Sequence, residues 1–154
     1  MDIYFLRHGE AVDAPPGGSD AERELTAKGH KQSAKVAGWL AKNGVVFDHI
    51  ICSARERAQQ TAEPVAEALG VPVITDARVS GGRLSARTLA EMLGELGNPG
   101  RVLLVGHEPD FSDVIEQLTD GIVEMKKGAL AAVRCGMVGE AQGMLILLVP
   151  PKWL

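Results

Sequence analysis

Two histidines stand directly after apolar runs in the two halves of the chain. His8 follows Ile3-Tyr4-Phe5-Leu6 and Arg7, and His107 follows a hydrophobic segment that ends in Val105-Gly106. Such runs predict buried strands, and open α/β sheets bind ligands at the carboxyl ends of their strands. We therefore expect the two imidazoles to face one another at one edge of a sheet.

The chemistry that suits such a pair is phosphoryl transfer through a histidine. A neutral imidazole nitrogen of His8 can attack phosphorus and form a covalent intermediate. The guanidinium group of Arg7 offers a rigid, permanently charged fork for phosphoryl oxygens, and His107 can donate to another oxygen. This chemistry requires no metal ion and no cofactor. The alternative for an isolated Arg-His-Gly is a strand-end histidine bonded to a nearby carbonyl.

Four sequence blocks place these residues in a wider pattern. They are Leu6-Arg7-His8-Gly9-Glu10-Ala11, Arg23-Glu24-Leu25-Thr26 with Gly29 after it, Ser53-Ala54-Arg55-Glu56-Arg57-Ala58 with Gln60-Thr61-Ala62, and Gly106-His107-Glu108-Pro109. In order and spacing the blocks resemble the histidine phosphatase superfamily, which includes the phosphoglycerate mutases. The short length and the opening block are similar to those of SixA-type phosphohistidine phosphatases. The resemblance covers nearly the whole chain and implies a phosphoglycerate mutase-like fold.

The resemblance also implies roles for individual residues. His8 matches the nucleophile of the family, and Arg7, Arg57 and His107 match the groups that hold phosphoryl oxygens. Arg23 matches a position that reaches the phosphate from the rim of the site, with a surface role as the alternative.

Arg55 and Arg57 stand two residues apart at a predicted helix start. Side chains at this spacing leave a helix in nearly opposite directions, so we expect only one to enter the site. The family pattern, in which the phosphate-binding arginine directly precedes the alanine of Arg-Ala-x-Gln-Thr, selects Arg57. Arg55 is then a solvated surface charge or, as the alternative, a substrate contact. The helix amino terminus adds donors that favour phosphate.

The carboxylates bear on the substrate class. Many sugar-phosphate phosphatases and mutases of the superfamily carry a glutamate after the third strand, where it protonates an alkoxide leaving group. Here that region, residues 75–82, contains Asp76 and no glutamate. A phosphohistidine needs less help, because an imidazole whose other nitrogen is protonated leaves as a neutral molecule. The chain also lacks a long insertion that would form a lid, so we expect an exposed His8 in an open pocket.

The sequence therefore predicts removal of phosphate from a phosphohistidine-bearing protein, such as a signalling phosphotransfer domain, through phospho-His8. The alternative within enzymes is a small-molecule phosphomonoesterase in which Asp76, Glu108 or Asp110 serves as the acid. A non-catalytic phosphate-binding regulatory module is the alternative from another class. Glu10 and Glu108 are candidate supporting residues, and Glu10 either orients the neighbouring Arg-His pair or is solvated.

Length and composition fit a small enzyme. With 154 residues, 45% of them hydrophobic, the chain can bury one core, and we expect a single domain over residues 1–154 and a monomer. The formal net charge of -4 argues against a nucleic-acid partner. Two cysteines are too few for a disulfide framework, and the first residues lack signal-peptide features, so we expect a cytoplasmic location. The late apolar run 144–149 is too short to span a bilayer, so we expect no membrane partner.

Apolar runs alternate with helical patterns along the chain. The predicted strands are 3–6, 48–52, 72–74, 101–105, 130–135 and 144–149, and a glycine-rich turn at 136–143 joins the last two. The predicted helices are 26–42, 54–69, 85–96 and 109–118, with Thr26 and Ser85 as N-caps and Pro109 in a first turn. Pro64 predicts a break or kink near Glu63. This alternation predicts a three-layer α/β/α sandwich with a mostly parallel sheet and 101–105 at its centre.

Overall fold

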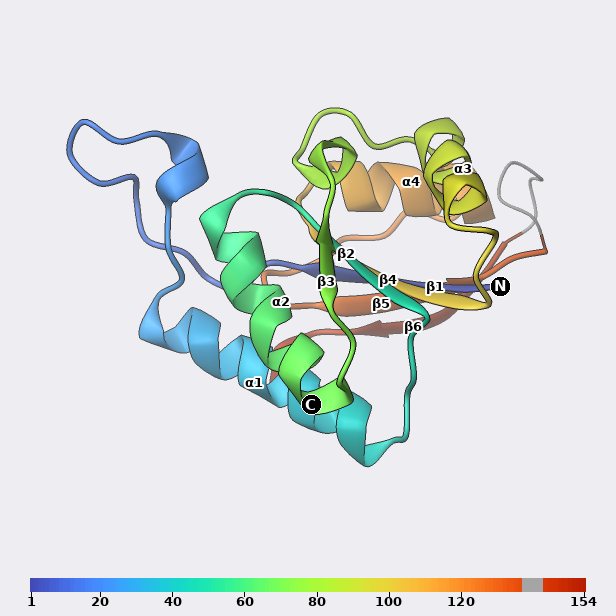
Figure 1. Cartoon of the computed structure of the whole chain (residues 1–154), viewed down its shortest axis with the longest axis horizontal. Coiled ribbons are helices and arrows are strands. Elements are labelled where there is room, and N and C mark those ends of the chain that lie inside the picture. Colours follow the sequence, from blue (N-terminus) through green and yellow to red (C-terminus); the bar gives the residue numbers. More distant parts are fainter. Residues whose placement is uncertain (137–142) are drawn as a thin grey trace.

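Six strands form one sheet in the computed structural model, which describes residues 1–136 and 143–154 (Figure 1). The strand order is β3-β2-β4-β1-β5-β6. The strands are β1 (Asp2–Arg7), β2 (His49–Cys52), β3 (Val73–Thr75), β4 (Arg101–Gly106), β5 (Leu130–Arg134) and β6 (Met144–Val149). β3, β2, β4 and β1 pair in parallel, whereas β5 pairs antiparallel with both β1 and β6. The predictions of a mostly parallel sheet and a central 101–105 strand are confirmed.

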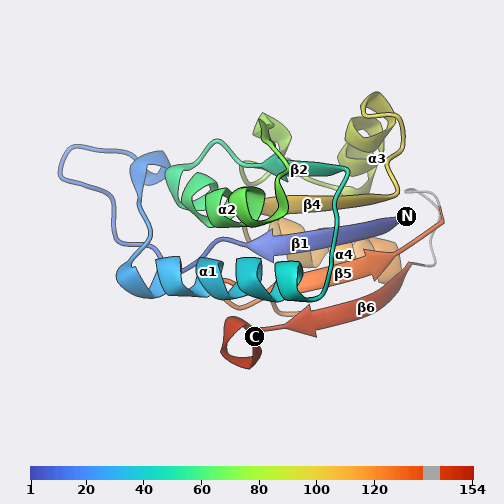
Figure 2. The ribbon, with the colours of Figure 1, turned by 60° about the horizontal axis from the view of Figure 1, so that its bottom comes forward.

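Helices cover both faces of this sheet. They are α1 (Ala27–Lys42), α2 (Glu56–Leu69), α3 (Ala86–Glu95) and α4 (Asp110–Thr119), with short 3-10 turns η1 (Asp20–Glu22), η2 (Ala77–Val79) and η3 (Pro151–Trp153). Figure 2 shows α1 and α2 in front of the strands and α3 and α4 behind them. The three-layer prediction is confirmed. Most of the glycine-rich turn predicted at 136–143 lies outside the described residues.

The two core layers follow the alternation of side chains along each strand. Ile3 and Phe5 face α3 and α4, where Phe5 meets Phe111 edge to face at a ring-centroid distance of 5.3 Å. The intervening Tyr4 faces α1 and α2 and meets Phe47 at 5.0 Å. β4 is covered on both faces, since residues 102–105 are fully buried. This rigid centre fixes the strand ends from which the site is built.

Local signals define the ends of the helices. The Thr26 hydroxyl accepts a hydrogen bond from the Gly29 amide at 3.0 Å and so caps α1, and Ser85 caps α3 as predicted. α2 begins two residues later than predicted, because Arg55 adopts an extended N-cap conformation. The helix continues through Pro64, so of the predicted break or kink near Glu63 the break is wrong. Buried residues on both sides of the proline, at 62 and 65, hold this part of the helix against the sheet.

The segment between β1 and α1 extends beyond the carboxyl end of β1 and carries η1 (Figure 1, blue). A bridge between Ala11 and Leu25 closes its base. None of the helices in the described part of the chain combines the length and apolar character needed to cross a bilayer.

Candidate active site

β1 and β4 end side by side and bring the two predicted histidines together. Arg7 pairs with Gly106 at the last register position, and the His8 amide donates to the Gly106 carbonyl at 3.0 Å. The rings of His8 and His107 follow directly, with centroids 5.1 Å apart. The expected pair therefore lies at the carboxyl edge of the sheet.

The surroundings of His8 leave one ring nitrogen unprotonated. Nδ1 lies 2.7 Å from the carbonyl oxygen of Gly9, which can only accept, so Nδ1 carries the proton and Nε2 keeps its lone pair. Burial, together with the charges of Arg57 and Arg7, lowers the pKa of His8 to about 4 and outweighs the opposing effect of the Gly9 hydrogen bond. The imidazole is neutral near pH 7 and suited to nucleophilic attack.

Arg57 points directly at this nitrogen. Its Nε donates to Nε2 of His8 at 3.2 Å, and the residue is only 4% exposed. It is the second residue of α2, so the helix amino terminus and the guanidinium group add positive potential at the same place. Burial lowers the pKa of Arg57, but guanidinium remains charged at neutral pH. Arg57 can therefore hold a phosphoryl group in front of His8.

Arg7 and His107 each keep a buried donor or acceptor without a partner among the described residues. Arg7 donates through Nη1 to the carbonyl of Met125 at 2.6 Å, while its Nε is unpaired. His107 Nε2 lies 2.7 Å from the hydroxyl of Ser53, while its Nδ1 is unpaired. Burial and the charges of His8 and Arg57 lower the pKa of His107 to about 3. Unpaired buried polar atoms are costly unless a ligand satisfies them, which fits an anion site.

Asp20 of η1, which no sequence pattern marks, accepts hydrogen bonds from three arginines. Its Oδ2 accepts from Arg57 Nη2 at 3.1 Å and from Arg55 Nη1 at 3.0 Å, and its Oδ1 accepts from Arg23 Nη1 at 3.2 Å. Burial alone would raise the pKa of Asp20, but the hydrogen bonds from Arg23 and Arg57 outweigh it and hold the pKa below its ordinary value. An ionised carboxylate thus lies where cationic groups converge.

The shared contact with Asp20 corrects the expectation for Arg55. The two side chains were expected to leave the helix on opposite sides, yet both reach the same carboxylate oxygen. Helical spacing does not apply here, because Arg55 is the N-cap with an extended backbone and only Arg57 lies within α2. Burial still separates them, since the side chain of Arg55 is 33% exposed and that of Arg57 is 5% exposed.

The two histidines are more buried than expected. His8 is 7% exposed and His107 is 3% exposed, so the expectation of an exposed His8 is wrong. The segment at 11–25 reaches Arg57, which contacts His8, without a long insertion. The carbonyl of Asp20 also accepts from Arg57 Nη1 at 2.8 Å, which fastens the segment beside the histidine.

Close backbone packing fixes the loop that carries His8. The Gly9 amide donates to the Thr61 hydroxyl at 3.1 Å, and that hydroxyl donates to the Arg57 carbonyl at 2.7 Å. A β-carbon on Gly9 would lie 2.8 Å from the Gly29 carbonyl oxygen, and one on Gly29 would overlap the Glu10 carbonyl oxygen. The first turn of α1 and the His8 loop therefore touch through bare backbone.

The candidate carboxylates differ in what they contact. Glu10 accepts from the Thr26 hydroxyl at 3.1 Å and pairs with Lys28 at 3.3 Å, so its carboxylate is held by α1 rather than by Arg7 or His8. Asp76 caps η2 and forms an ion pair with Arg78, whose hydrogen bonds lower the pKa of Asp76. An ionised, paired carboxylate is a poor proton donor.

Asp110 and Glu108 complete the set of possible acids. The two oxygens of Asp110 accept from three backbone amides, those of residues 82–84, so this carboxylate anchors a loop. Glu108 accepts from the Ser112 hydroxyl at 2.6 Å through Oε2, while Oε1 is buried and unpaired among the described residues. Of the three proposed general acids, Asp76, Glu108 and Asp110, Glu108 is therefore the one with a carboxylate oxygen that has no hydrogen-bond partner among the described residues.

Asp20, Ser53 and Thr61 are the functional candidates that sequence reasoning missed. Ser53 and Thr61 lay within the matched blocks, so their position in those blocks was an available signal. Asp20 lies in a loop between two blocks, and no periodic pattern marks it.

Sequence comparisons give two informative relatives. A family model described as the histidine phosphatase superfamily (branch 1) matches residues 3–98. A protein of Picosynechococcus sp. (strain ATCC 27264 / PCC 7002 / PR-6), whose name states no function, is 34% identical over 163 aligned positions that cover 100% of this chain and 99% of that protein. The phosphohistidine phosphatase SixA of Escherichia coli (strain K12) is 32% identical over 127 positions, covering 79% of this chain and 76% of that protein.

Solved structures extend the comparison to the fold. The protein histidine phosphatase SixA complexed with tungstate superposes with a TM-score of 0.85 and 25% identity, over 99% of this chain and 98% of that one. The α-ribazole phosphatase of Shigella flexneri has a TM-score of 0.76 over 98% of this chain and 97% of that one. Its 19% identity makes it a similarity of fold.

Proposed function

The chain belongs to the histidine phosphatase superfamily, and we propose that within it this protein is a metal-independent phosphohistidine phosphatase acting on another protein. The observation that carries the proposal is the neutral His8, whose Nε2 lone pair faces a buried arginine at 3.2 Å. The proposal includes one domain over residues 1–154, a monomer, and a cytoplasmic location.

In the first step His8 Nε2 attacks phosphorus in line with the leaving group. The bond from phosphorus to the substrate imidazole breaks as the bond to His8 forms, and the substrate histidine departs neutral when its other ring nitrogen is protonated. Arg57, Arg7 and His107 bind the equatorial oxygens, which carry the charge of the transition state. Bound phosphate would satisfy the unpaired Nε of Arg7, and it would satisfy Nδ1 of His107 in the state in which Nδ1 carries a proton.

In the second step water attacks phospho-His8. The bond between phosphorus and Nε2 breaks, inorganic phosphate leaves, and His8 returns to its neutral form with the proton still on Nδ1. The carbonyl of Gly9 holds that proton in place through both steps, since it accepts from Nδ1 at 2.7 Å. No metal is needed, because the arginines supply the positive charge.

The carboxylates support a substrate with a good leaving group. Asp76 is paired with Arg78, and Asp110 is committed to backbone amides, so neither is placed to donate a proton. The kinship with Escherichia coli SixA supports the same substrate class. A non-catalytic phosphate-binding module would require no nucleophilic lone pair at His8, so that alternative explains less of the geometry.

A second candidate is a small-molecule phosphomonoesterase, and the observation that favours it is the unpaired oxygen of Glu108. In that role Glu108 would protonate an alkoxide leaving group. The fold shared with the α-ribazole phosphatase is compatible with such a substrate.

A leaving-group series separates the two candidates. We expect kcat/KM to fall steeply from phosphohistidine and activated aryl phosphates to alkyl phosphates, because no acid assists departure. Glu108→Gln should leave the slope unchanged. A flat series in the wild type that becomes steep in Glu108→Gln would establish an acid and favour the phosphomonoesterase.

A further inference from the structure

Nearly all the lysines of the chain line a groove beside the active site. The groove has a volume of about 640 Å³ and is formed by α1, the loop before β5 and η3. The chain has seven lysines, and six of them line this groove; the seventh, Lys42, lies at the far end of α1. The six are Lys28, Lys31, Lys35, Lys126, Lys127 and Lys152. A chain of net charge -4 thus carries one concentrated positive surface.

The groove shares its wall with the loop that carries His8. The amide of Gly128 donates to the His8 carbonyl at 3.0 Å, and Gly128 directly follows Lys126 and Lys127. On the other wall, Lys28 pairs with Glu10, two residues after His8. A molecule lying in the groove would therefore extend away from the His8 loop, where the phosphoryl group of the substrate must lie.

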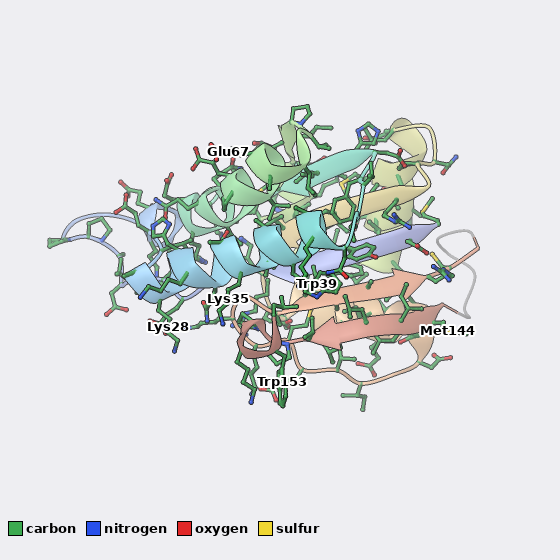
Figure 3. The ribbon with its side chains drawn as sticks, turned by 90° about the horizontal axis from the view of Figure 1, so that it is seen from below. Lys28, Lys35, Trp39, Glu67, Met144 and Trp153 are labelled. Atoms are coloured by element: carbon green, nitrogen blue, oxygen red, sulfur yellow. The ribbon has the colours of Figure 1, made fainter. Side chains whose placement is uncertain are left out.

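The groove is built by tight packing rather than by loose side chains. A β-carbon on Gly128 would lie 3.0 Å from Cβ of Gln32 and 3.2 Å from Cγ of Pro151, so loop, helix and carboxyl-terminal turn are in contact. Lys35 reaches the Pro151 carbonyl at 3.5 Å. Figure 3 shows Lys35 on α1 facing the same side of the molecule as Trp153, which is 74% exposed.

The positive charge of the groove is only partly compensated. Lys28 pairs with Glu10 and Lys126 pairs with Glu124. The other four lysines have no carboxylate within ion-pair distance among residues 1–136 and 143–154, and none of the described residues that line the groove is acidic.

We propose that this lysine groove docks an acidic segment of the phosphohistidine-bearing protein and so selects the substrate; the inference rests on the proposed function. A buried His8 can react only with a phosphohistidine held against the surface around it, and the lysine groove adjoins that surface. Proline and tryptophan side chains beside the lysines suit a peptide with apolar side chains between acidic ones. A nucleic acid fits less well, because its long phosphate backbone would also meet the negative remainder of the protein.

Short peptides with one phosphohistidine, flanked by either glutamates or glutamines, test the proposal. At low salt we expect the wild type to prefer the glutamate peptide by about tenfold in kcat/KM, through KM rather than kcat. The preference should weaken in Lys31→Gln/Lys35→Gln and disappear in Lys31→Glu/Lys35→Glu. The control Lys42→Glu, on the same helix but outside the groove, should keep it. An aryl phosphate should be hydrolysed equally by all four proteins.

Binding without turnover separates this inference from the proposed function. In a Trp39→Phe background Trp153 is the remaining tryptophan, and its emission should shift when the unphosphorylated glutamate peptide binds. If no phosphohistidine peptide is hydrolysed, the proposed function fails, while a Trp153 shift that is lost in the Lys31→Glu/Lys35→Glu variant would still support an acidic ligand.

Three outcomes would overturn the groove proposal. They are equal kcat/KM for both peptides with no Trp153 shift, a preference that survives charge reversal of Lys31 and Lys35, and tighter binding of a single-stranded oligonucleotide than of the glutamate peptide.

Discussion

The Asp20 carboxylate lies 3.1 Å from Nη2 of Arg57, on the same guanidinium group that donates through Nε to Nε2 of His8. One buried cation thus connects a surface loop to the proposed nucleophile. Because Arg23 and Arg55 reach the same carboxylate, Asp20 neutralises charges that a phosphoryl group would otherwise meet. We therefore expect a substrate phosphate and Asp20 to compete for these donors.

Asp20→Asn should therefore raise the affinity for inorganic phosphate. Loss of one negative charge among three arginines should lower the inhibition constant of phosphate by about tenfold, as expected for one charged hydrogen bond. Inhibition of aryl phosphate hydrolysis measures this, and Asp13→Asn, on the same loop, is the matched control. Weaker phosphate binding in Asp20→Asn would mean that Asp20 orders the arginines for the ligand rather than competing with it.

His8→Ala should reduce kcat by at least about a thousandfold, because the covalent route is lost. Acid-labile phosphate should be trapped on the wild type and not on the variant. His8 is buried, so His8→Gln, which keeps a polar side chain, serves as a second variant, with circular dichroism to show that both are folded. Near-normal turnover in either variant would contradict the mechanism.

Arg57→Ala should lower kcat/KM by about a hundredfold or more, whereas Arg55→Ala should change it only a few-fold. Arg57 is buried against His8, while Arg55 is partly solvated and bonds only to the loop carboxylate among its side-chain contacts in the described part of the chain. Arg57→Lys should restore little of the lost kcat/KM, because lysine lacks a planar guanidinium group that can donate to His8 and to the phosphate at the same time. Equal losses for Arg55→Ala and Arg57→Ala would show that both hold substrate.

Acid should destabilise the protein before its carboxylates titrate. Burial lowers the pKa of His8 to about 4 and that of His107 to about 3, from 6.5 in the unfolded chain. Below pH 6.5 the unfolded chain binds protons that the folded protein does not. The free energy of unfolding therefore decreases as the pH is lowered. The slope reaches up to about 1.4 kcal/mol per pH unit for each histidine.

Urea denaturation between pH 6.5 and 5 measures this slope. His8→Gln should make it shallower, and His30→Gln, on the exposed face of α1, should not. An unfolding free energy that is constant over this range in the wild type would contradict the assignment of two neutral buried histidines.

The main parts of the site could be predicted from sequence because they depend on local rules. His8 and His107 follow buried strands, and strand ends in a parallel sheet meet at one edge. Thr26 and Ser85 cap helices through contacts within three residues of themselves. Each of these features depends on residues that are close to one another in the sequence.

What could not be predicted depends on how distant segments meet. The contact of Asp20 with Arg57 spans 37 residues, and that of Ser53 with His107 spans 54. Helical spacing misled for Arg55, because a residue one position before a helix does not obey the geometry of the helix. The burial of His8 involves contacts with residues distant in the sequence, Arg57 and Gly128, which composition does not reveal.

The contact between Gly9 and Gly29 makes the active-site loop and the start of α1 a single mechanical unit. With only backbone between them, neither has a side chain that could adjust its length or rotamer if the other shifted. Transplanting the Arg-His-Gly loop onto another α/β scaffold would therefore also require the first turn of α1, including its glycine. A graft of the loop alone would lack the surface against which the proposed nucleophile, His8, is held.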